Sequence, residues 1–281
     1  MDLRALWLRL RLRPCLRLRL GLSLVLGSPF VFLASCAQTA ALPSPVIEPS
    51  SSVGEAELDP LVPSPPLPCP DEMVLVSGAS CPKVRQVCLR WVDPPGPYRE
   101  FRCAEYQKPS ECLAPREAMR FCIDRDEYTS PGERLPLVGQ SWTSATRICE
   151  AAGKRLCQES EWQFACEGEQ MAPYPYGDGF VRDREACNID QTRLGRPQEG
   201  LRDLRVPAGS QPRCASPFGV RDMSGNVEEW TTLDKGRAPE RSAMKGAWWL
   251  PGKNTCRAVT LGHGEVYRGP QVGVRCCRDV R

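Results

Sequence analysis

The sequence predicts an exported, disulfide-rich head in which two helices and a few short strands are joined by long loops. Three observations lead to this expectation. The 281-residue chain opens on a basic and then apolar leader, it holds 16 cysteines, and two stretches carry a helical period. The first two features are typical of a chain that folds outside the reducing cytosol. A chain of this length accommodates one large domain or two small ones.

Residues 1–35 resemble an export signal. Six arginines precede the apolar run LGLSLVLGSPFVFLA, which is too short and too interrupted to span a membrane as a stable helix. The run ends in LASC, with Ala34 and Ser35 directly before Cys36. This ending resembles the lipobox of bacterial lipoproteins, in which the cysteine is acylated and becomes the new N-terminus. We therefore expect lipidation at Cys36; the alternative is a plain secretory signal cut near Ala37 or Ala40.

The positive charge of the chain belongs to this leader. The formal net charge of the full chain is +3 and becomes −2 without residues 1–35. A head with this charge has no electrostatic footprint for nucleic acid, so we exclude that class of partner. Ala37 follows the lipid cysteine where an aspartate would favour retention in the inner membrane. The expected location is therefore the cell envelope, with the outer membrane preferred.

Residues 36–68 are interpreted as the lipid anchor and a tether. The stretch is rich in proline and serine, lacks aromatic residues and shows no helical or strand period. The folded head is expected over residues 69–281. Within it, residues 81–122 carry five cysteines among prolines and glycines. We interpret this part as a loop-rich, disulfide-stapled excursion, because its apolar content is too small for a core of its own.

Regular structure is expected in a few places. MVLVSG (73–78) and FCIDRDEYT (121–129) are predicted as strands. SWTSATRICEAAGKRL is predicted as a helix capped by Thr143 and stopped by Gly153. Its apolar face consists of Ala145, Ile148, Cys149 and Ala152. A second helix, roughly Gln158–Glu167, has Trp162, Ala165 and Cys166 on one face and ends before Gly168. From there to the C-terminus mostly loop with short strands is expected.

The cysteines predict disulfides rather than a metal site. Without Cys15 in the leader and Cys36 at the lipobox, fourteen cysteines remain, an even number that predicts up to seven bridges. No two cysteines have CxxC spacing, and the chain contains one histidine. This argues against zinc ribbons, thioredoxin-type redox sites and iron–sulfur clusters.

The order of short motifs after Met73 resembles the formylglycine-generating-enzyme, or sulfatase-modifying-factor, domain. The motifs are MVLVSG, FCIDRDEYT, SWTSATRICEAAGKRLCQESEWQFACEG, YPYGD, CNID, FGVRDMSGNVEEWT, KGAWW and GVRCCRD. The match runs over about Met73–Asp279, interrupted by the excursion, and the pairing of GKRL…ESEW with DMSGNVEEW is its most specific part. The resemblance implies a compact α+β fold related to C-type lectins, with little regular secondary structure and with bound calcium.

The resemblance implies that the loop DMSGNVEEW (222–230) wraps a calcium ion. Carried over by position, the ligands are the carboxylates of Asp222 and Glu229 and the backbone carbonyls of Gly225 and Val227. Such a set suits Ca²⁺, which prefers six to eight hard oxygen ligands. The alternative is a polar turn in which Asp222 or Asn226 bonds its own backbone.

A second implied calcium site is less regular. Its ligands are Asn188, the carbonyl of Ile189, and groups around Glu199 and Leu201, with Glu199 standing where the family usually has aspartate. The resemblance also implies two disulfides that join the helices to the C-terminal segment, Cys149–Cys276 and Cys166–Cys256. For Cys157, Cys277 and the pair Cys187/Cys214 the connectivity stays open.

The catalytic chemistry of the family is not matched. Catalytic members oxidise a substrate cysteine to formylglycine with O₂ and a copper ion, which two cysteines hold just after a Gly-Gly-Ser motif. In KGAWWLPGKNTCRA, Ala247 stands at the serine position and no cysteine lies between Gly246 and Thr255. Cys256 falls where the structural bridge belongs. We therefore expect no copper site, no catalytic residue and no formylglycine chemistry.

Other constellations are weaker. Relatives that make carbon–sulfur bonds use several histidines, whereas this chain has His263 alone. Glu159 and Glu161 diverge on a helix, so they are interpreted as carboxylates stabilised in a first turn rather than as an acid–base pair. Four aromatic residues are candidates for a recognition groove, although at least half should belong to the core. They are Tyr174, Tyr176, Trp248 and Trp249.

These observations favour a cell-envelope lipoprotein whose head is a non-catalytic binding or assembly scaffold. Its partner is expected to be an envelope protein, peptide or glycan held in the family's substrate cleft. The alternative is an oxygen- and metal-dependent oxidase that acts on a protein cysteine, and a weaker one is an accessory to a neighbouring envelope enzyme. The oxidase predicts at least one free, reactive cysteine in the folded protein, whereas the binding scaffold predicts none.

Overall fold

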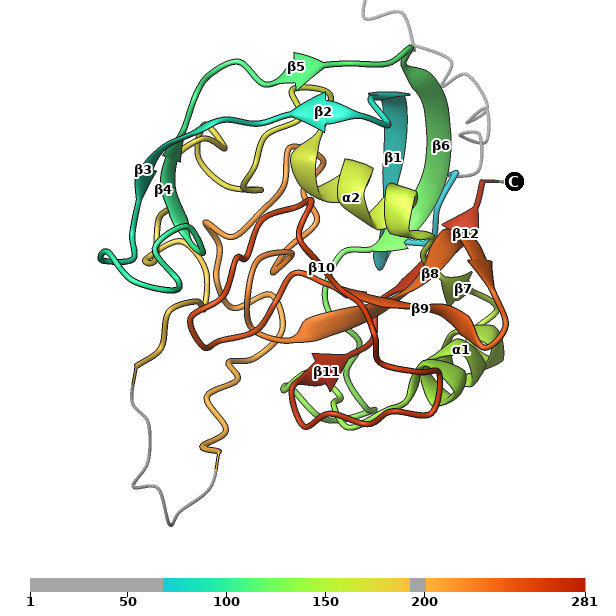
Figure 1. Cartoon of the computed structure of the whole chain (residues 1–281). Helices are drawn as coiled ribbons and strands as arrows, with labels where there is room; N and C mark the ends of the chain where they lie inside the picture. Colours follow the sequence, from blue (N-terminus) through green and yellow to red (C-terminus); the bar gives the residue numbers. More distant parts are fainter. Residues whose placement is uncertain (1–67, 193–200, 281) are drawn as a thin grey trace, which may run out of the picture. The chain divides into compact units, whose positions relative to one another are not determined.

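The computed structural model describes residues 68–192 and 201–280 (Figure 1). The expected leader, the lipidation site at Cys36, nearly all of the tether and Glu199 lie outside the described residues. The described residues belong to one compact unit, Pro63–Arg281. Two helices of ten and nine residues accompany twelve strands, most of them short. The expected α+β class with little regular secondary structure is confirmed.

The first sheet has the strand order β1-β6-β12-β7. The strands are β1 (Met73–Ser80), β6 (Glu117–Asp124), β7 (Arg155–Leu156) and β12 (Cys276–Asp279). The expected strand at 73–78 is confirmed within β1, which pairs antiparallel with β6 over eight residues. The second expected strand begins earlier than predicted and ends at Asp124, because the Asp124 carboxylate accepts the N–H of Cys276 and the amide of Arg125 turns back to Glu72.

The first helix, α1, spans Trp142–Ala151 and lies beside β7 (Figure 1). The predicted cap at Thr143 is wrong. Ser141 is the N-cap, its Oγ accepting the amide of Ser144 at 3.1 Å, while Thr143 donates its hydroxyl to the carbonyl of Glu265. The helix stops at Gly153, whose φ of +66° suits glycine. Ala145 and Cys149 are buried as predicted, but Ala152 is the C-cap and is exposed.

The second helix, α2, spans Glu159–Glu167 and confirms the prediction closely. Gln158 is its N-cap, and the Glu161 carboxylate accepts the backbone N–H of Gln158 at 2.8 Å. Trp162, Ala165 and Cys166 are fully buried, and Gly168 ends the helix. With Val76, Phe121 and Ile123 of the first sheet they form one part of the core.

The second sheet has the strand order β10-β9-β8-β11. The strands are β8 (Glu228–Arg237), β9 (Glu240–Lys245), β10 (Val259–Thr260) and β11 (Val272–Gly273). The expectation of mostly loop in this part is wrong for the β8–β9 hairpin. Its pairing depends on the partner strand, and its inner residues Trp230 and Met244 pack on α1 through Trp142 and Ala145 in a second part of the core.

The excursion at 81–122 is more ordered than predicted. It contains β2 (Val84–Arg85), β3 (Cys88–Trp91), β4 (Cys103–Tyr106) and β5 (Glu111–Cys112), which form two separate two-stranded ladders, β2-β5 and β3-β4. Two disulfides, Cys81–Cys112 and Cys88–Cys103, close the excursion. Cross-links therefore stabilise strand pairs that bury little apolar surface.

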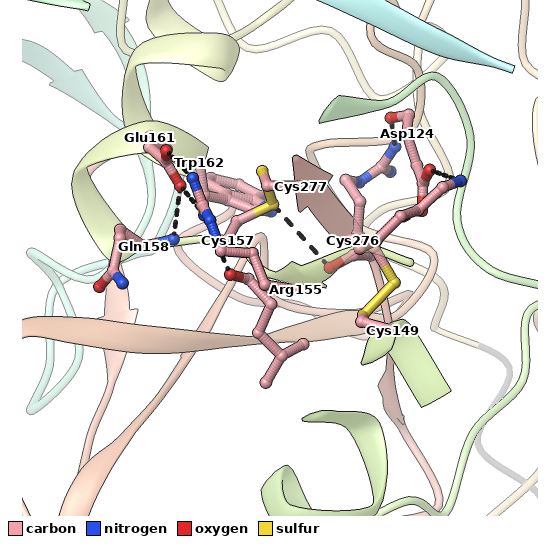
Figure 2. Close-up of a disulfide and its surroundings, with 12 residues drawn as sticks. Asp124, Cys149, Arg155, Cys157, Gln158, Glu161, Trp162, Cys276 and Cys277 are labelled. Atoms are coloured by element: carbon pink, nitrogen blue, oxygen red, sulfur yellow. Dashed lines mark hydrogen bonds and ion pairs between the residues drawn. A yellow bond between two sulfur atoms is a disulfide. The ribbon is translucent and has the colours of Figure 1, made fainter. Parts of the chain in front are cut away.

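All fourteen cysteines between positions 69 and 277 are paired. Besides the two bridges of the excursion, they form Cys69–Cys122, Cys149–Cys276, Cys157–Cys277, Cys166–Cys256 and Cys187–Cys214. Cys149–Cys276 and Cys166–Cys256 are the pairs that the resemblance implies. Figure 2 shows how the neighbouring Cys276 and Cys277 hold β12 to α1 and to Cys157, between β7 and α2.

Of the seven disulfides, the three that close the longest loops contribute most to stability. They join cysteines 90, 120 and 127 residues apart, and each is worth about 4–5 kcal/mol in the chain-entropy model. Seven disulfides in so small a head indicate an oxidising environment, as expected for an exported protein. In the part of the chain that the structure describes, no helix is both long and apolar enough to cross a bilayer.

Candidate functional site

A small pocket lies where the excursion meets the second sheet. Its volume is about 260 Å³, and it is bounded by the start of β8, the end of β9, β10 and the turn at 247–253. The residues that matter for its chemistry are Phe101, Glu228, Ala247, Trp248, Lys253 and Thr260. Ala247, which the resemblance places at the family's serine position, lines this pocket.

Larger hollows lie elsewhere on the described part of the head. One of about 700 Å³ runs along the excursion beside Arg85 and Met171, one of about 580 Å³ lies at the β8–β9 turn near Asp234, and one of about 470 Å³ lies beside Tyr174 and Asp178. None of these three contains a residue of the 246–256 segment. The smaller pocket is therefore the candidate functional site, because it brings that segment together with the loop 222–230.

The 246–256 segment has no free thiol. Cys256 is bonded to Cys166 of α2, and its backbone N–H donates to the carbonyl of Pro173. Ala247 has a φ of +55° and carries only a methyl group toward the pocket. The pocket wall therefore lacks the two cysteine thiolates and the serine hydroxyl that the resemblance implies for catalytic members of the family.

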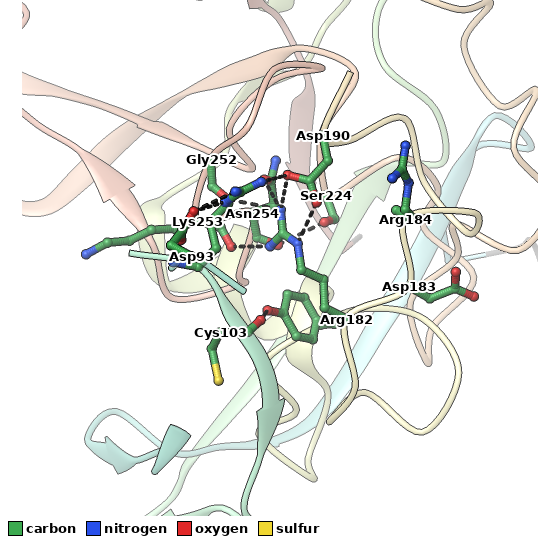
Figure 3. A network of polar contacts seen from close by, with 12 residues as sticks. Asp93, Cys103, Arg182, Asp183, Arg184, Asp190, Ser224, Gly252, Lys253 and Asn254 are labelled. Atoms are coloured by element: carbon green, nitrogen blue, oxygen red, sulfur yellow. Dashed lines mark hydrogen bonds and ion pairs between the residues drawn. The ribbon is translucent and has the colours of Figure 1, made fainter. Parts of the chain in front are cut away.

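Arg182 holds the turn that forms one wall of the pocket (Figure 3). Its guanidinium donates to the carbonyls of Gly252 and Lys253 at 3.0 and 3.1 Å and to Oδ1 of Asn254 at 2.8 Å. The side chain is 3% exposed and pairs with Asp190 at 2.9 Å. Burial raises the pKa of Asp190, but the hydrogen bonds and positive charges of Arg182 and Arg102 together outweigh burial, so the net pKa is lowered and the carboxylate is ionised.

A second arginine fastens the excursion to the same carboxylate. Arg102 donates to Asp190 at 2.8 Å and to Asp93 at 2.9 Å. The bonds from Arg102 lower the pKa of Asp93. The ladder Asp93–Arg102–Asp190–Arg182 thus joins the excursion to the 252–254 turn. Phe101, the neighbour of Arg102, lines the pocket. No pattern in the sequence pointed to these pairings, because the four residues come from distant segments.

Glu228 is the acidic group of the pocket. Its side chain is buried, and its Oε1 accepts the hydroxyl of Thr260 at 2.7 Å. Burial raises the pKa of Glu228, and hydrogen bonds from Thr260 and Gln271 offset part of that increase. Among the described residues, no lysine or arginine forms an ion pair with it. Glu228 was not predicted as a site residue from the sequence, where its one signal is its position as a second acid beside the implied ligand Glu229.

The rest of the loop 222–230 is built into a buried polar network. Glu229 accepts two hydrogen bonds from Arg275, both at 2.7 Å, and one from Trp162 at 2.6 Å. Burial opposes the charge of Arg275, but Glu229 outweighs it and the pKa of the guanidinium is raised. Asn226 donates to Glu127 at 2.6 Å and accepts from the side chain of Asn188 at 3.0 Å.

Asp222 supports a cation at the first implied calcium site. Its Oδ2 accepts the amide of Gly209 at 2.6 Å, whereas its Oδ1 is buried without a partner. Burial raises the pKa of Asp222 to about 6. Burial and the nearby Asp222 and Glu229 raise the pKa of Glu127 well above its usual range. Three buried carboxylates thus face one guanidinium, and a divalent cation would neutralise the excess charge.

The other implied ligands fit less completely. Glu229 is engaged by Arg275 and Trp162, and no three His, Cys, Asp or Glu side chains within 68–192 and 201–280 are grouped to share a metal ion. A Cβ at Gly225 would overlap the carbonyl oxygen of Asn188, so Gly225 also serves close packing. For the second site, Ile189 is buried but Leu201 is 46% exposed. Of the two implied carboxylate ligands of the first site, Asp222 therefore keeps a buried oxygen without a partner among the described residues, whereas both oxygens of Glu229 are hydrogen-bonded.

The remaining candidates divide between core and surface. Tyr174, Tyr176 and Trp249 are buried in the core, as at least half of the four aromatics were expected to be, while Trp248 lines the pocket. His263 stacks on Tyr267 with ring centroids 4.0 Å apart. Two carboxylates lie in the first turn of α2. Glu161 accepts the backbone N–H of Gln158 and completes the cap of the helix, and Glu159 lies 3.6 Å from Lys245.

Comparisons with known proteins agree with the fold. The model of the sulfatase-modifying factor enzyme 1-like domain matches residues 96–280. The chain is 31% identical over 153 residues to the inactive C-alpha-formylglycine-generating enzyme 2 of Mus musculus, covering 50% of this chain and 48% of that protein. It is 32% identical over 127 residues to the formylglycine-generating enzyme of Mycobacterium tuberculosis, covering 43% of this chain and 40% of that enzyme. The chain thus spans about half the length of the curated relatives it matches. Among solved structures, CarF aligns with a TM-score of 0.49 at 15% identity, over 75% of this chain and 99% of CarF.

Proposed function

Because this chain belongs to the sulfatase-modifying factor enzyme 1-like family, we propose that it is a non-catalytic binding or assembly protein of the cell envelope. The observation that carries this proposal is the state of Cys256, which is bonded to Cys166 instead of standing free beside the pocket. A protein built this way retains the family scaffold and its cleft, and it holds a partner in that cleft without oxidising it.

The chemistry of copper supports this assignment. Cu(I) is held by soft thiolate ligands, and every cysteine of the described head is committed to a disulfide. The alanine at position 247 has no hydroxyl to place beside a reacting group. A relative that matches half of this chain is itself named an inactive formylglycine-generating enzyme. The pocket wall thus presents apolar and polar contacts in place of redox ligands.

The proposed setting is the outside of a membrane, preferably the outer membrane. Cys36 at the end of LASC would carry the lipid anchor, and residues 37–68 would hold the head away from the bilayer. The seven disulfides support export. The partner we propose is an envelope protein, a peptide or a glycan, and nucleic acid is excluded on charge.

We also propose that calcium stabilises the loop 222–230. The unpartnered Oδ1 of Asp222 supports a bound cation, with the carbonyls of Gly225 and Val227 as further ligands and the carboxylate of Glu229 nearby. When bound, the ion would supply positive charge to the buried carboxylates. The ion would also fix the position of the loop 222–230, from which Glu228 extends into the pocket.

The proposal is tested by incubating the full chain with Cu(I), O₂ and a Cys-X-Pro-X-Arg peptide. The peptide mass is followed together with the number of free thiols in the unreduced, denatured protein. The expected result is an unchanged peptide and no thiol from the head. Aldehyde formation that disappears in Cys256→Ser, but persists in the matched control Cys187→Ser, would make the protein an oxidase and refute the proposal.

A further inference from the structure

The pocket ends on a buried carboxylate that lacks a counter-ion. Most other buried acids of the head are paired with a cation, among them Glu229 with Arg275, Glu167 with Arg257 and Asp190 with Arg182. Glu228 is 6% exposed, its Oε1 accepts the hydroxyl of Thr260, and among the described residues no lysine or arginine forms an ion pair with it. The other exceptions are Asp222, in the loop 222–230, and Glu127, which accepts a hydrogen bond from Asn226 of that loop; neither lines this pocket.

A buried, unpaired carboxylate is costly unless a partner compensates it. Glu228 differs from a structural acid because it lines a pocket that opens to solvent. Lys253 also lies on the pocket wall. The missing counter-charge can therefore be supplied from solution through the pocket.

The walls above Glu228 suit an aliphatic stem with a cationic end. Phe101, Trp248, Pro251 and Val259 line the pocket with aromatic and aliphatic surface. Aromatic faces attract ammonium and guanidinium groups, and Lys253 Nζ already lies 6.0 Å from the ring centroid of Phe101. The volume of about 260 Å³ is below the range of pockets for drug-sized ligands, which begins at about 300 Å³, so one side chain fits.

We propose that this pocket binds the side chain of a lysine or arginine from a partner peptide or protein, with its cation on Glu228 and its stem against Phe101 and Trp248. This inference rests on the proposed binding role of the head and names its ligand. It also gives the excursion a role. The Arg102–Asp190 pair holds the excursion in place, and Phe101, the neighbour of Arg102, lines the pocket together with Trp248.

The test uses isothermal titration calorimetry on the full chain, with N-acetyl-lysine methylamide and its neutral isostere N-acetyl-norleucine methylamide. The lysine derivative should bind and the isostere should not. Glu228→Gln keeps an acceptor for Thr260 and removes the charge, so it should weaken binding of the lysine derivative at least ~10-fold. Glu240→Gln, the same change at an exposed acid of β9 outside the pocket, should leave binding unchanged.

Two outcomes overturn the inference. One is equal binding of the norleucine derivative, or no binding of the lysine derivative. The other is unchanged affinity in Glu228→Gln, provided that its thermal unfolding matches that of the unmodified protein. If a neutral glycan binds through Trp248 instead, the choice of ligand is wrong while the binding role stands. Aldehyde formation in the copper assay refutes the binding role itself, so the two failures are distinguishable.

Discussion

Replacing Arg275 with methionine should be among the most destabilising single changes in the head. Arg275 is fully buried and donates to both oxygens of Glu229 and to the backbone carbonyls of Asp124 and Arg221. It therefore joins the loop 222–230 to the end of β6. Methionine has a similar length, so the variant removes the charge and the donors while leaving little cavity.

The magnitude follows from what is left unpaired. Breaking a buried ion pair by removing one partner typically costs about 3–5 kcal/mol, because the remaining charge stays buried without compensation. Here Glu229 keeps only Trp162, and Glu127 and Asp222 lose the one guanidinium that attracts them. For a head of this size about 2–4 °C of melting temperature correspond to 1 kcal/mol, so the melting temperature should fall by about 6–20 °C.

The assay is thermal unfolding of the oxidised full chain, followed by circular dichroism in the presence of EGTA so that metal cannot compensate. The matched control is Arg237→Met, at an exposed position of β8, which should change the melting temperature by less than about 2 °C. A loss below about 1 kcal/mol in Arg275→Met would refute the reasoning. It would mean that the carboxylates around Arg275 are neutral or solvated in the folded protein.

Three further changes test other parts of the account. Calcium at 100 times its dissociation constant should stabilise the unmodified chain by about 2.7 kcal/mol in thermal unfolding, and it should not stabilise the variant Asp222→Asn. Equal stabilisation of both proteins would contradict Asp222 as a calcium ligand. Lys245 is buried, and burial lowers its pKa to about 8 in the folded protein. Its positive charge therefore destabilises the folded state below pH 8, and this destabilisation fades as the pH rises toward 10.5, the pKa of lysine in the unfolded chain. Lys245→Met should therefore gain stability in denaturant unfolding at pH 7, by up to about 3 kcal/mol, and gain less at pH 9.5, whereas a pH-independent difference would refute this cause. Gly225→Ala should cost more than about 1 kcal/mol in the same assay, because Gly225 has a left-handed backbone with a φ of +87° and the carbonyl of Asn188 leaves no room for a methyl group. The control is Gly219→Ala, which has the same φ but lies in open space, so it measures the cost of the backbone conformation alone.

Local sequence patterns were sufficient to predict secondary structure wherever one segment determines its own conformation. The second helix was predicted within one residue at its start, because its apolar face, its N-terminal carboxylates and the following Gly168 all lie within eleven residues. The first helix was predicted less well at its ends. Ser141 and Thr143 are both good cap residues, and the choice of Ser141 depends on Thr143 being engaged by Glu265, more than a hundred residues away.

The same distinction explains the strands and the pocket. The β8–β9 hairpin has few apolar residues of its own and forms because Trp230 and Met244 meet α1, which a local pattern does not contain. Arg182, Asp190 and Arg102 read as ordinary surface charges until the fold brings their segments together. Glu228 was missed for a related reason. Its neighbour Glu229 carries the family pattern, and only the tertiary structure shows which of the two faces the pocket and which faces Arg275.

The sequence by itself determined the family, the two helices, the even set of fourteen head cysteines and the absence of a cysteine between Gly246 and Thr255, because each is a matter of residue type at close spacing. Only the tertiary structure decided how all of those cysteines pair, which acids are neutralised, and that the excursion supplies Phe101 to the pocket. The physical reason is that electrostatic compensation, disulfide geometry and pocket shape depend on distances between segments far apart in the chain, and folding sets those distances.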